Sequence, residues 1–220
     1  MASQPDFFDA LRDTLVREMP ECTDLAGVER LSGGASMETY RLTIRTQGGE
    51  QLLCMRRGAG GIDRDNVSAV GLANEALLMR TAKDHGVAEP EIYYELQPAD
   101  GVGVGFVMEW LSGETLGSRI VRSAELETVR PLLADQCGRE LAKIHAIDVE
   151  ATGLSDHLPV LGPAEYLEQT WGRYRDWDTA QPMIDFTGRW LEENLPQGTN
   201  YRLVHNDFRN GNLMVNSEEG

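Results

Sequence analysis

The stretch that decides the fold is YRLVHNDFRNGNLMV, residues 201–215. Two apolar runs, at residues 201–204 and 213–215, bracket a polar loop, and this pattern predicts two short strands joined by a turn. In the loop an aspartate follows a histidine by two residues, and an asparagine follows the aspartate by five (His205, Asp207 and Asn212). A carboxylate and an amide oxygen are therefore expected on one rigid turn.

Such a pair suits phosphoryl transfer to a hydroxyl group. A carboxylate orients the hydroxyl and takes its proton, while an oxygen ligand nearby holds Mg²⁺ where charge builds on the transferred group. The H-x-D-x-x-x-x-N spacing is that of the catalytic loop of the kinase fold. It predicts Asp207 as the catalytic base and Asn212 as a metal ligand. The alternative is a polar surface turn in which these residues occur by chance.

The part of the chain before residue 110 is rich in predicted strands. An opening amphipathic helix is expected to end before Pro20. One further helix is expected at residues 66–85. Alternation and turn signals predict strands at residues 28–31, 38–46, 52–55, 91–96 and 104–110.

The rest of the chain is mainly helical. Its predicted helices lie at residues 131–147, 164–177 and 183–194, and His145 on the first of them is expected to be a packed core residue. The order predicts an α+β fold of two lobes. Residues 1–109 form an N-terminal lobe with an antiparallel sheet and one helix, and residues 110–220 form part of a helical C-terminal lobe.

Composition and charge exclude several classes of protein. The net charge of −16 repels phosphate backbones and anionic lipid, so neither nucleic acid nor a membrane is expected as a partner. The three cysteines are widely spaced, which argues against a disulfide framework or a zinc ribbon and fits a reducing cytoplasm. The start has no secretory signal, and no run reaches the about 18 apolar residues of a membrane span. A cytoplasmic protein is expected.

The segment from His205 to Asn212 resembles the catalytic loop of the aminoglycoside phosphotransferase family, which includes choline-kinase-like and other small-molecule kinases. In that family a glycine commonly stands between the histidine and the aspartate, where this chain has Asn206. The resemblance implies a protein-kinase-like fold, ATP and Mg²⁺ as cofactors, and a hydroxyl group of a small molecule as acceptor. It also implies that Arg209 steadies the γ-phosphate.

A glycine-containing segment between two predicted strands resembles the turn that covers the nucleotide phosphates in this family. Gly33 and Gly34 would let backbone N–H groups approach phosphate oxygens, and Ser32 and Ser36 would add hydroxyl donors. Gly-Gly turns are equally common in plain hairpins, so both interpretations stay open for this segment.

Arg56 follows the apolar run at residues 52–55, where the family's strand carries a lysine that binds ATP. An arginine can pair with phosphates through two parallel hydrogen bonds, so the substitution is chemically tolerable. Glu75, in the predicted helix, is the expected ion-pair partner of Arg56. The alternative is that Arg56 and Arg57 are ordinary residues at the end of a strand with no role in binding phosphate. A contact between Arg57 and Glu75 would mean a register error of one residue.

The segment FVMEWL, residues 106–111, resembles the hinge between the lobes. In a hinge of this kind the backbone C=O of Glu109 and the backbone N–H of Leu111 bind the adenine edge.

The family's second metal-binding carboxylate, in a D-x-[DE] segment, is expected after the catalytic loop. No aspartate follows Asp207 in these 220 residues, so a truncated chain that does not turn over ATP by itself is predicted. A pseudokinase or a nucleotide-binding module is the alternative. The sequence is also similar to the branch found alongside acyl-CoA dehydrogenases, which implies a hydroxyacyl-type metabolite as acceptor, with an aminoglycoside as the second choice.

Overall fold

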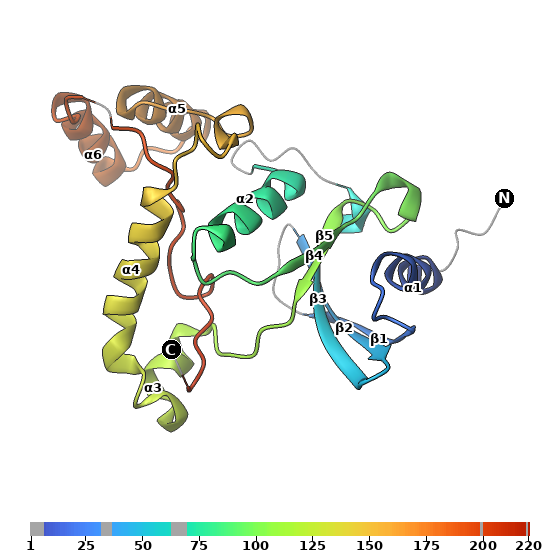
Figure 1. Cartoon of the computed structure of the whole chain (residues 1–220). Helices are drawn as coiled ribbons and strands as arrows, with labels where there is room; N and C mark the ends of the chain where they lie inside the picture. The colour runs from blue at the N-terminus through green and yellow to red at the C-terminus, as the bar shows by residue number, and fades with distance from the viewer. Residues whose placement is uncertain (1–6, 32–36, 63–69, 199, 219) are drawn as a thin grey trace. The chain divides into compact units, whose positions relative to one another are not determined.

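A computed structural model describes residues 7–31, 37–62, 70–198, 200–218 and 220 of the chain (Figure 1). The chain divides into two compact units, Met1–Ile147 with Val204–Gly220, and Asp148–Leu203. The loop around Asp207 therefore belongs to the same unit as the predicted sheet. The predicted lobe boundary near residue 110 lies inside the larger unit, and it stays a prediction.

The larger unit is built on a five-stranded antiparallel sheet with the order β1-β2-β3-β5-β4. The strands are β1 (Asp24–Leu31), β2 (Met37–Thr46), β3 (Gly49–Gly58), β4 (Ile92–Glu95) and β5 (Gly105–Glu109). β2 and β3 pair along their whole lengths across the turn at Gly48 and Gly49. The predicted α+β class with an antiparallel sheet is confirmed.

Two helices cover opposite faces of this sheet (Figure 1). Helix α1 (Phe7–Glu18) packs on the face that carries Met55 and Val107. Helix α2 (Leu72–Asp84) packs on the face that carries Phe106. Because successive strand residues point to opposite faces, Phe106 and Val107 belong to different cores.

Helix α2 begins later than the sequence predicted. Gly71, the residue before it, has φ 77° and ψ 156°, a conformation that no helix contains and that glycine adopts without a steric penalty. The helix therefore begins at Leu72 and not at residue 66. Residues 66–69 lie outside the described part of the chain.

The larger unit also contains α3 (Gly117–Arg122) and α4 (Leu133–Ala146). Ile144 of α4 is buried. The next residue, His145, is exposed, so the prediction of a packed core histidine was wrong. One residue advances a helix by about 100°, which turns this side chain away from the buried side.

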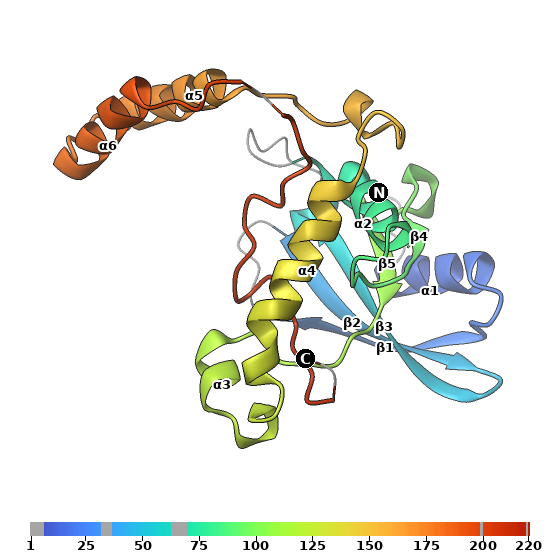
Figure 2. The same ribbon diagram turned by 60° about the vertical axis from the view of Figure 1, so that its left-hand side comes forward.

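The smaller unit holds α5 (Pro163–Asp176) and α6 (Pro182–Glu193), which lie side by side (Figure 2). The Trp171 ring lies against Gly188, the one buried residue of α6, where any side chain would collide with it. Both helices were predicted from sequence. None of the described helices is both long and apolar enough to cross a bilayer.

The two apolar runs around the catalytic loop do not form the predicted pair of strands. The run at residues 201–204 is divided between the two units and forms no strand. Val215 forms an isolated antiparallel bridge with Glu114 instead. The prediction failed because the backbone of Val215 finds its hydrogen-bond partners in the segment after β5, and not across its own loop.

Candidate active site

The loop from His205 to Asn212 closes around the carboxylate of Asp207. Arg209 Nε donates to Asp207 Oδ1 at 2.8 Å, and Asn212 Nδ2 donates to Oδ2 at 2.6 Å. Asn212 Nδ2 also donates to the backbone oxygen of Asp207 at 2.9 Å, and the Asn212 N–H donates to Arg209 O at 3.0 Å. Both oxygens of the predicted base are therefore held by side chains that follow within five residues.

Two residues in the left-handed conformation shape this turn. Asn206 has φ 63° and Gly211 has φ 100°. Glycine adopts positive φ freely, and asparagine is among the few other residues that are enriched there. This requirement explains the departure at position 206, because asparagine can take the conformation of the glycine that is common in the family.

The charge of Asp207 is stabilised by its neighbours. Hydrogen bonds from Arg209 and then Asn212 hold the pKa of the Asp207 carboxyl below its usual range. The side chain is 57% exposed, so a small molecule can reach it. Asp207 is therefore an accessible carboxylate at neutral pH, the form that accepts a hydroxyl proton.

The predicted ion pair on the sheet is confirmed. Arg56 Nη1 lies 2.6 Å from Glu75 Oε1, and both side chains are mostly buried. Arg56 of β3 is paired in register with Phe106 of β5, whose side chain packs against α2. Arg56 therefore faces α2, in whose first turn Glu75 lies. Its role in binding phosphate stays a prediction.

The neighbouring arginine has a different environment. The Arg57 guanidinium lies 4.6 Å above the ring of Phe7 on α1, and Nη1 lies 3.5 Å from Glu38 Oε2. Arg57 thus points to the α1 face of the sheet, as strand alternation requires. A register in which Arg57 contacts Glu75 is excluded.

The predicted hinge residues lie at the end of β5. The Glu109 N–H donates to Glu91 O at 2.8 Å, and Glu109 Oε2 accepts from the Glu91 N–H at 3.1 Å. Within the described part of the chain, the Leu111 N–H donates to no backbone oxygen. This donor is therefore free of backbone partners, as a ligand contact needs, and the adenine contacts stay a prediction.

The predicted phosphate-covering residues, Ser32, Gly33, Gly34 and Ser36, lie outside the described residues. The strand ends on either side of them are described.

Sequence reasoning missed the residue that joins those strand ends, Glu38. Its buried carboxylate accepts from Tyr40 Oη at 2.9 Å, and Oε1 lies 3.4 Å from Arg30 Nη2. The signal was its position in the alternation of β2, which places a glutamate on the inward-facing side.

Asn212 is the predicted metal ligand. Its amide nitrogen bonds to Asp207, which leaves Oδ1 as the atom that could bind a cation. Mg²⁺ usually takes one or two carboxylates together with water and phosphate. Among the described residues, no group of three or more His, Cys, Asp and Glu side chains is placed to hold a metal. The role of Asn212 as a metal ligand stays a prediction.

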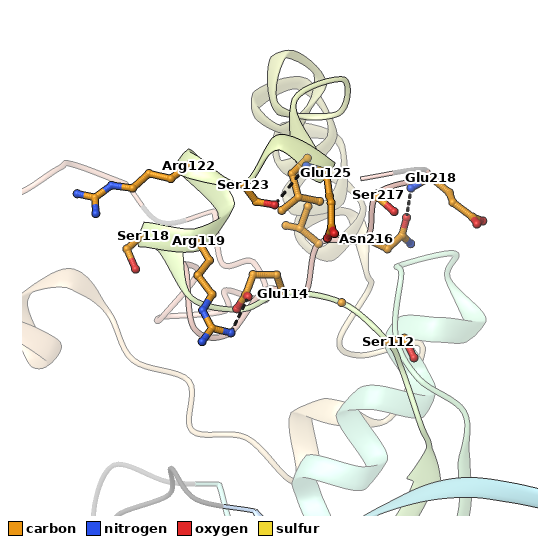
Figure 3. Close-up of a pocket in the computed structure, with 13 residues that line it drawn as sticks. Ser112, Glu114, Ser118, Arg119, Arg122, Ser123, Glu125, Asn216, Ser217 and Glu218 are labelled. Atoms are coloured by element: carbon orange, nitrogen blue, oxygen red, sulfur yellow. Dashed lines mark hydrogen bonds and ion pairs between the residues drawn. The ribbon is translucent and has the colours of Figure 1, made fainter.

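An open pocket of about 950 Å³ lies between the segment after β5 and the segment after the catalytic loop (Figure 3). Glu114 and Arg119 on one wall form an ion pair at 3.3 Å, and the Leu116 N–H and Arg119 lower the pKa of Glu114. Asn216 and Glu218 line another wall. Of the predicted nucleotide-binding residues that the structure describes, none lines this pocket.

The sequence pattern of the family described as "Phosphotransferase enzyme family" matches residues 27–220. The chain belongs to the phosphotransferase enzyme family. A mouse (Mus musculus) protein, "Acyl-CoA dehydrogenase family member 10", is 26% identical over 195 residues. That match covers 84% of this chain and 17% of the mouse protein.

Solved structures share the fold. A "putative aminoglycoside phosphotransferase" from Ralstonia eutropha superimposes with a TM-score of 0.74 at 24% identity, covering 96% of this chain and 61% of that one. A variant of aminoglycoside 2'-phosphotransferase IIIa, solved with GDP, gives a TM-score of 0.63 at 15% identity, covering 96% and 68%. These likenesses confirm the predicted protein-kinase-like fold, and the family match confirms the predicted relationship.

Proposed function

We propose that the protein transfers the γ-phosphate of ATP to a hydroxyl group of a small molecule, with Asp207 as the base. The observation that carries this proposal is the accessible Asp207 carboxylate, whose oxygens are held by Arg209 and Asn212. Membership of the phosphotransferase enzyme family supports the same reaction class.

In the proposed reaction the acceptor hydroxyl donates a hydrogen bond to Asp207. As its oxygen bonds to the γ-phosphorus, the bond from that phosphorus to the leaving oxygen of ADP breaks, and the hydroxyl proton passes to Asp207. Arg209 orients the base through Oδ1 and binds Asn210 O at 2.9 Å. We also assign to Arg209 the steadying of the γ-phosphate that the resemblance implies.

The nucleotide side of the proposed site is the sheet of the same unit. Arg56, oriented by Glu75, supplies a cation for the phosphates, and a guanidinium suits this because it can donate two parallel hydrogen bonds. Glu109 C=O and Leu111 N–H are proposed to bind the adenine edge. Mg²⁺ is proposed as the companion of ATP, because kinases of this fold use it to neutralise phosphate charge.

The proposed acceptor is a hydroxyacyl-type metabolite. This choice is supported by the mouse relative, whose name places it among acyl-CoA dehydrogenases. An aminoglycoside is the second choice, supported by the names of the solved neighbours and by the net charge of −16, which attracts polycations.

A phosphorylation screen tests the proposal. The protein, expressed as its gene encodes it, is incubated with γ-labelled ATP and a panel of hydroxyacyl thioesters, other hydroxy metabolites and aminoglycosides. Transfer to at least one hydroxyl compound is expected, and Asp207→Asn should abolish it. If no compound is labelled above the Asp207→Asn background, the proposed transfer is wrong.

The second candidate is a nucleotide-binding module without turnover. It is the alternative that the sequence left open. Calorimetric titration with ATP separates the two candidates, because binding without transfer to any acceptor supports the module.

A further inference from the structure

The catalytic loop needs an anchor in its unit. Its internal hydrogen bonds join residues at most five positions apart, so they shape the loop without placing it. Before the loop, Val204 is 52% exposed. Among the described residues between 204 and 220, Val215 is the one that is buried. The placement of Asp207 therefore depends on how Val215 is held.

Val215 is held by the segment that follows the hinge. Its N–H donates to Glu114 O at 3.0 Å, and its oxygen accepts from the Glu114 N–H at 2.8 Å. The Val215 side chain packs in a core cluster with Ile120, Leu126 and Val129. Figure 3 shows Glu114 and Asn216 on these two neighbouring segments.

Two glycines allow this close approach. A Cβ atom on Gly113 would lie 2.5 Å from Met214 Cγ and 2.9 Å from Val215 O. A Cβ atom on Gly117 would lie 2.8 Å from Asn210 Nδ2. At Gly113 the backbone contact is shorter than a carbon atom tolerates, so any side chain there must displace the segment that leaves the loop. At Gly117 a side chain must displace the side chain of Asn210.

We propose that Gly113 and Gly117 are positioning residues of the phosphotransfer site, because together they seat the catalytic loop against the segment after the hinge. The functional part of this inference rests on the proposed function. Gly113 sets the exit of the loop through the backbone of Val215, and Gly117 sets its tip through Asn210.

The contact of Gly113 with Val215 reaches the base through a short chain of contacts. Val215 lies three residues after Asn212, and Asn212 Nδ2 holds both the backbone and the carboxylate of Asp207. A shift of Val215 therefore moves the group that orients the base. A misplacement of about 1 Å can cost about 100-fold in rate.

The test compares alanine substitutions at three glycines. Gly113→Ala is expected to lower kcat by about 10- to 100-fold while the KM for ATP stays within about 3-fold, because the base moves and the sheet does not. The control is Gly138→Ala on α4, where an added Cβ meets nothing within 4 Å. Gly117→Ala should lower kcat less than Gly113→Ala, because its Cβ meets only a side chain.

A second substitution distinguishes an effect on the position of the loop from a general loss of stability. Shortening the opposing side chain in Gly113→Ala/Met214→Ala removes the nearest collision and should restore part of the lost kcat. If Gly113→Ala does not fold, Gly117→Ala with and without Asn210→Ala decides in the same way. A kcat equal to that of Gly138→Ala, or a change in the KM for ATP alone, overturns the proposal.

Amide hydrogen exchange tests the seat without any reaction. In Gly113→Ala the Val215 and Asn212 amides should exchange faster than in Gly138→Ala, because their acceptors are displaced. If exchange is faster but the protein phosphorylates nothing, the positioning of the loop by Gly113 is supported and the proposed function is overturned. Unchanged exchange at both amides would contradict the positioning of the loop by Gly113, whatever the activity.

Discussion

The ion pair on the sheet joins Arg56 of β3 to Glu75 of α2, whereas the catalytic loop holds Asp207 with side chains from its own next five residues. The Arg56 and Glu75 side chains are 34% and 21% exposed, and those of Asp207 and Arg209 are 57% and 63% exposed. The first arrangement needs two packed elements, and the second needs one turn.

This difference has a functional consequence under the proposed reaction. The part held by packing is assigned to binding the nucleotide, and the part held locally is assigned to the acceptor and the transferred phosphate. If the two parts are independent, substitutions in one should change nucleotide binding and substitutions in the other should change the chemical step.

The largest effect is expected from Asp207→Asn. Loss of a well-placed base should lower kcat by about 10²- to 10⁴-fold, while the dissociation constant for ATP stays nearly unchanged because the base contacts the acceptor. Transient kinetics and calorimetry measure the two quantities. Asp135→Asn, in an exposed helical ion pair with Arg139, is the matched control. Near-normal kcat in Asp207→Asn would remove Asp207 from the mechanism.

Arg56→Ala should produce the opposite pattern. Charge-assisted hydrogen bonds to phosphate contribute about 1.5–3 kcal/mol, so ATP should bind about 10- to 100-fold more weakly. Calorimetry with ATP and with adenosine measures this, and only ATP should be affected. Arg41→Ala, which removes an exposed partner of Glu29 on the same sheet, is the control. Equal losses for ATP and adenosine would contradict a phosphate contact.

Glu75→Gln should have a smaller effect on the same quantity. The amide keeps the shape of the side chain but loses the charge that orients Arg56, so ATP should bind about 3- to 10-fold more weakly. The two substitutions should not be additive, because both act through Arg56. An additive double variant would mean that Glu75 acts separately from Arg56.

The smallest effect is expected in the pH profile of Arg209→Gln. The base works as a carboxylate, so activity is lost as the pH falls through the Asp207 pKa, which Arg209 holds low. Removing Arg209 lets that pKa rise, so the acid limb of kcat should move to higher pH. Arg139→Gln is the control. A limb that stays in place would show that Arg209 does not tune the base.

The loop could be read from the sequence because its contacts are local. The spacing of Asp207 and Asn212 and the asparagine at position 206 already encode a turn in which the amide reaches the carboxylate. The segment against which the loop packs could not be predicted in this way. The partner of Val215 is Glu114, about a hundred positions earlier, and apolar runs beside a turn favour a hairpin in any local reading.

By itself the sequence determined the alternation of β2 and β3, the turn between them, the helices α1, α5 and α6, and the turn from His205 to Asn212, because each rests on neighbours within a few residues. The sequence predicted that Arg56 meets Glu75, and the tertiary structure excluded the register in which Arg57 does. The packing of β5 and α2 on one face places Arg56 there, and Phe7 and Glu38 hold Arg57 on the other. It also decided where the catalytic loop sits, because the fit of Gly113 against Val215 depends on atoms that come together only after folding.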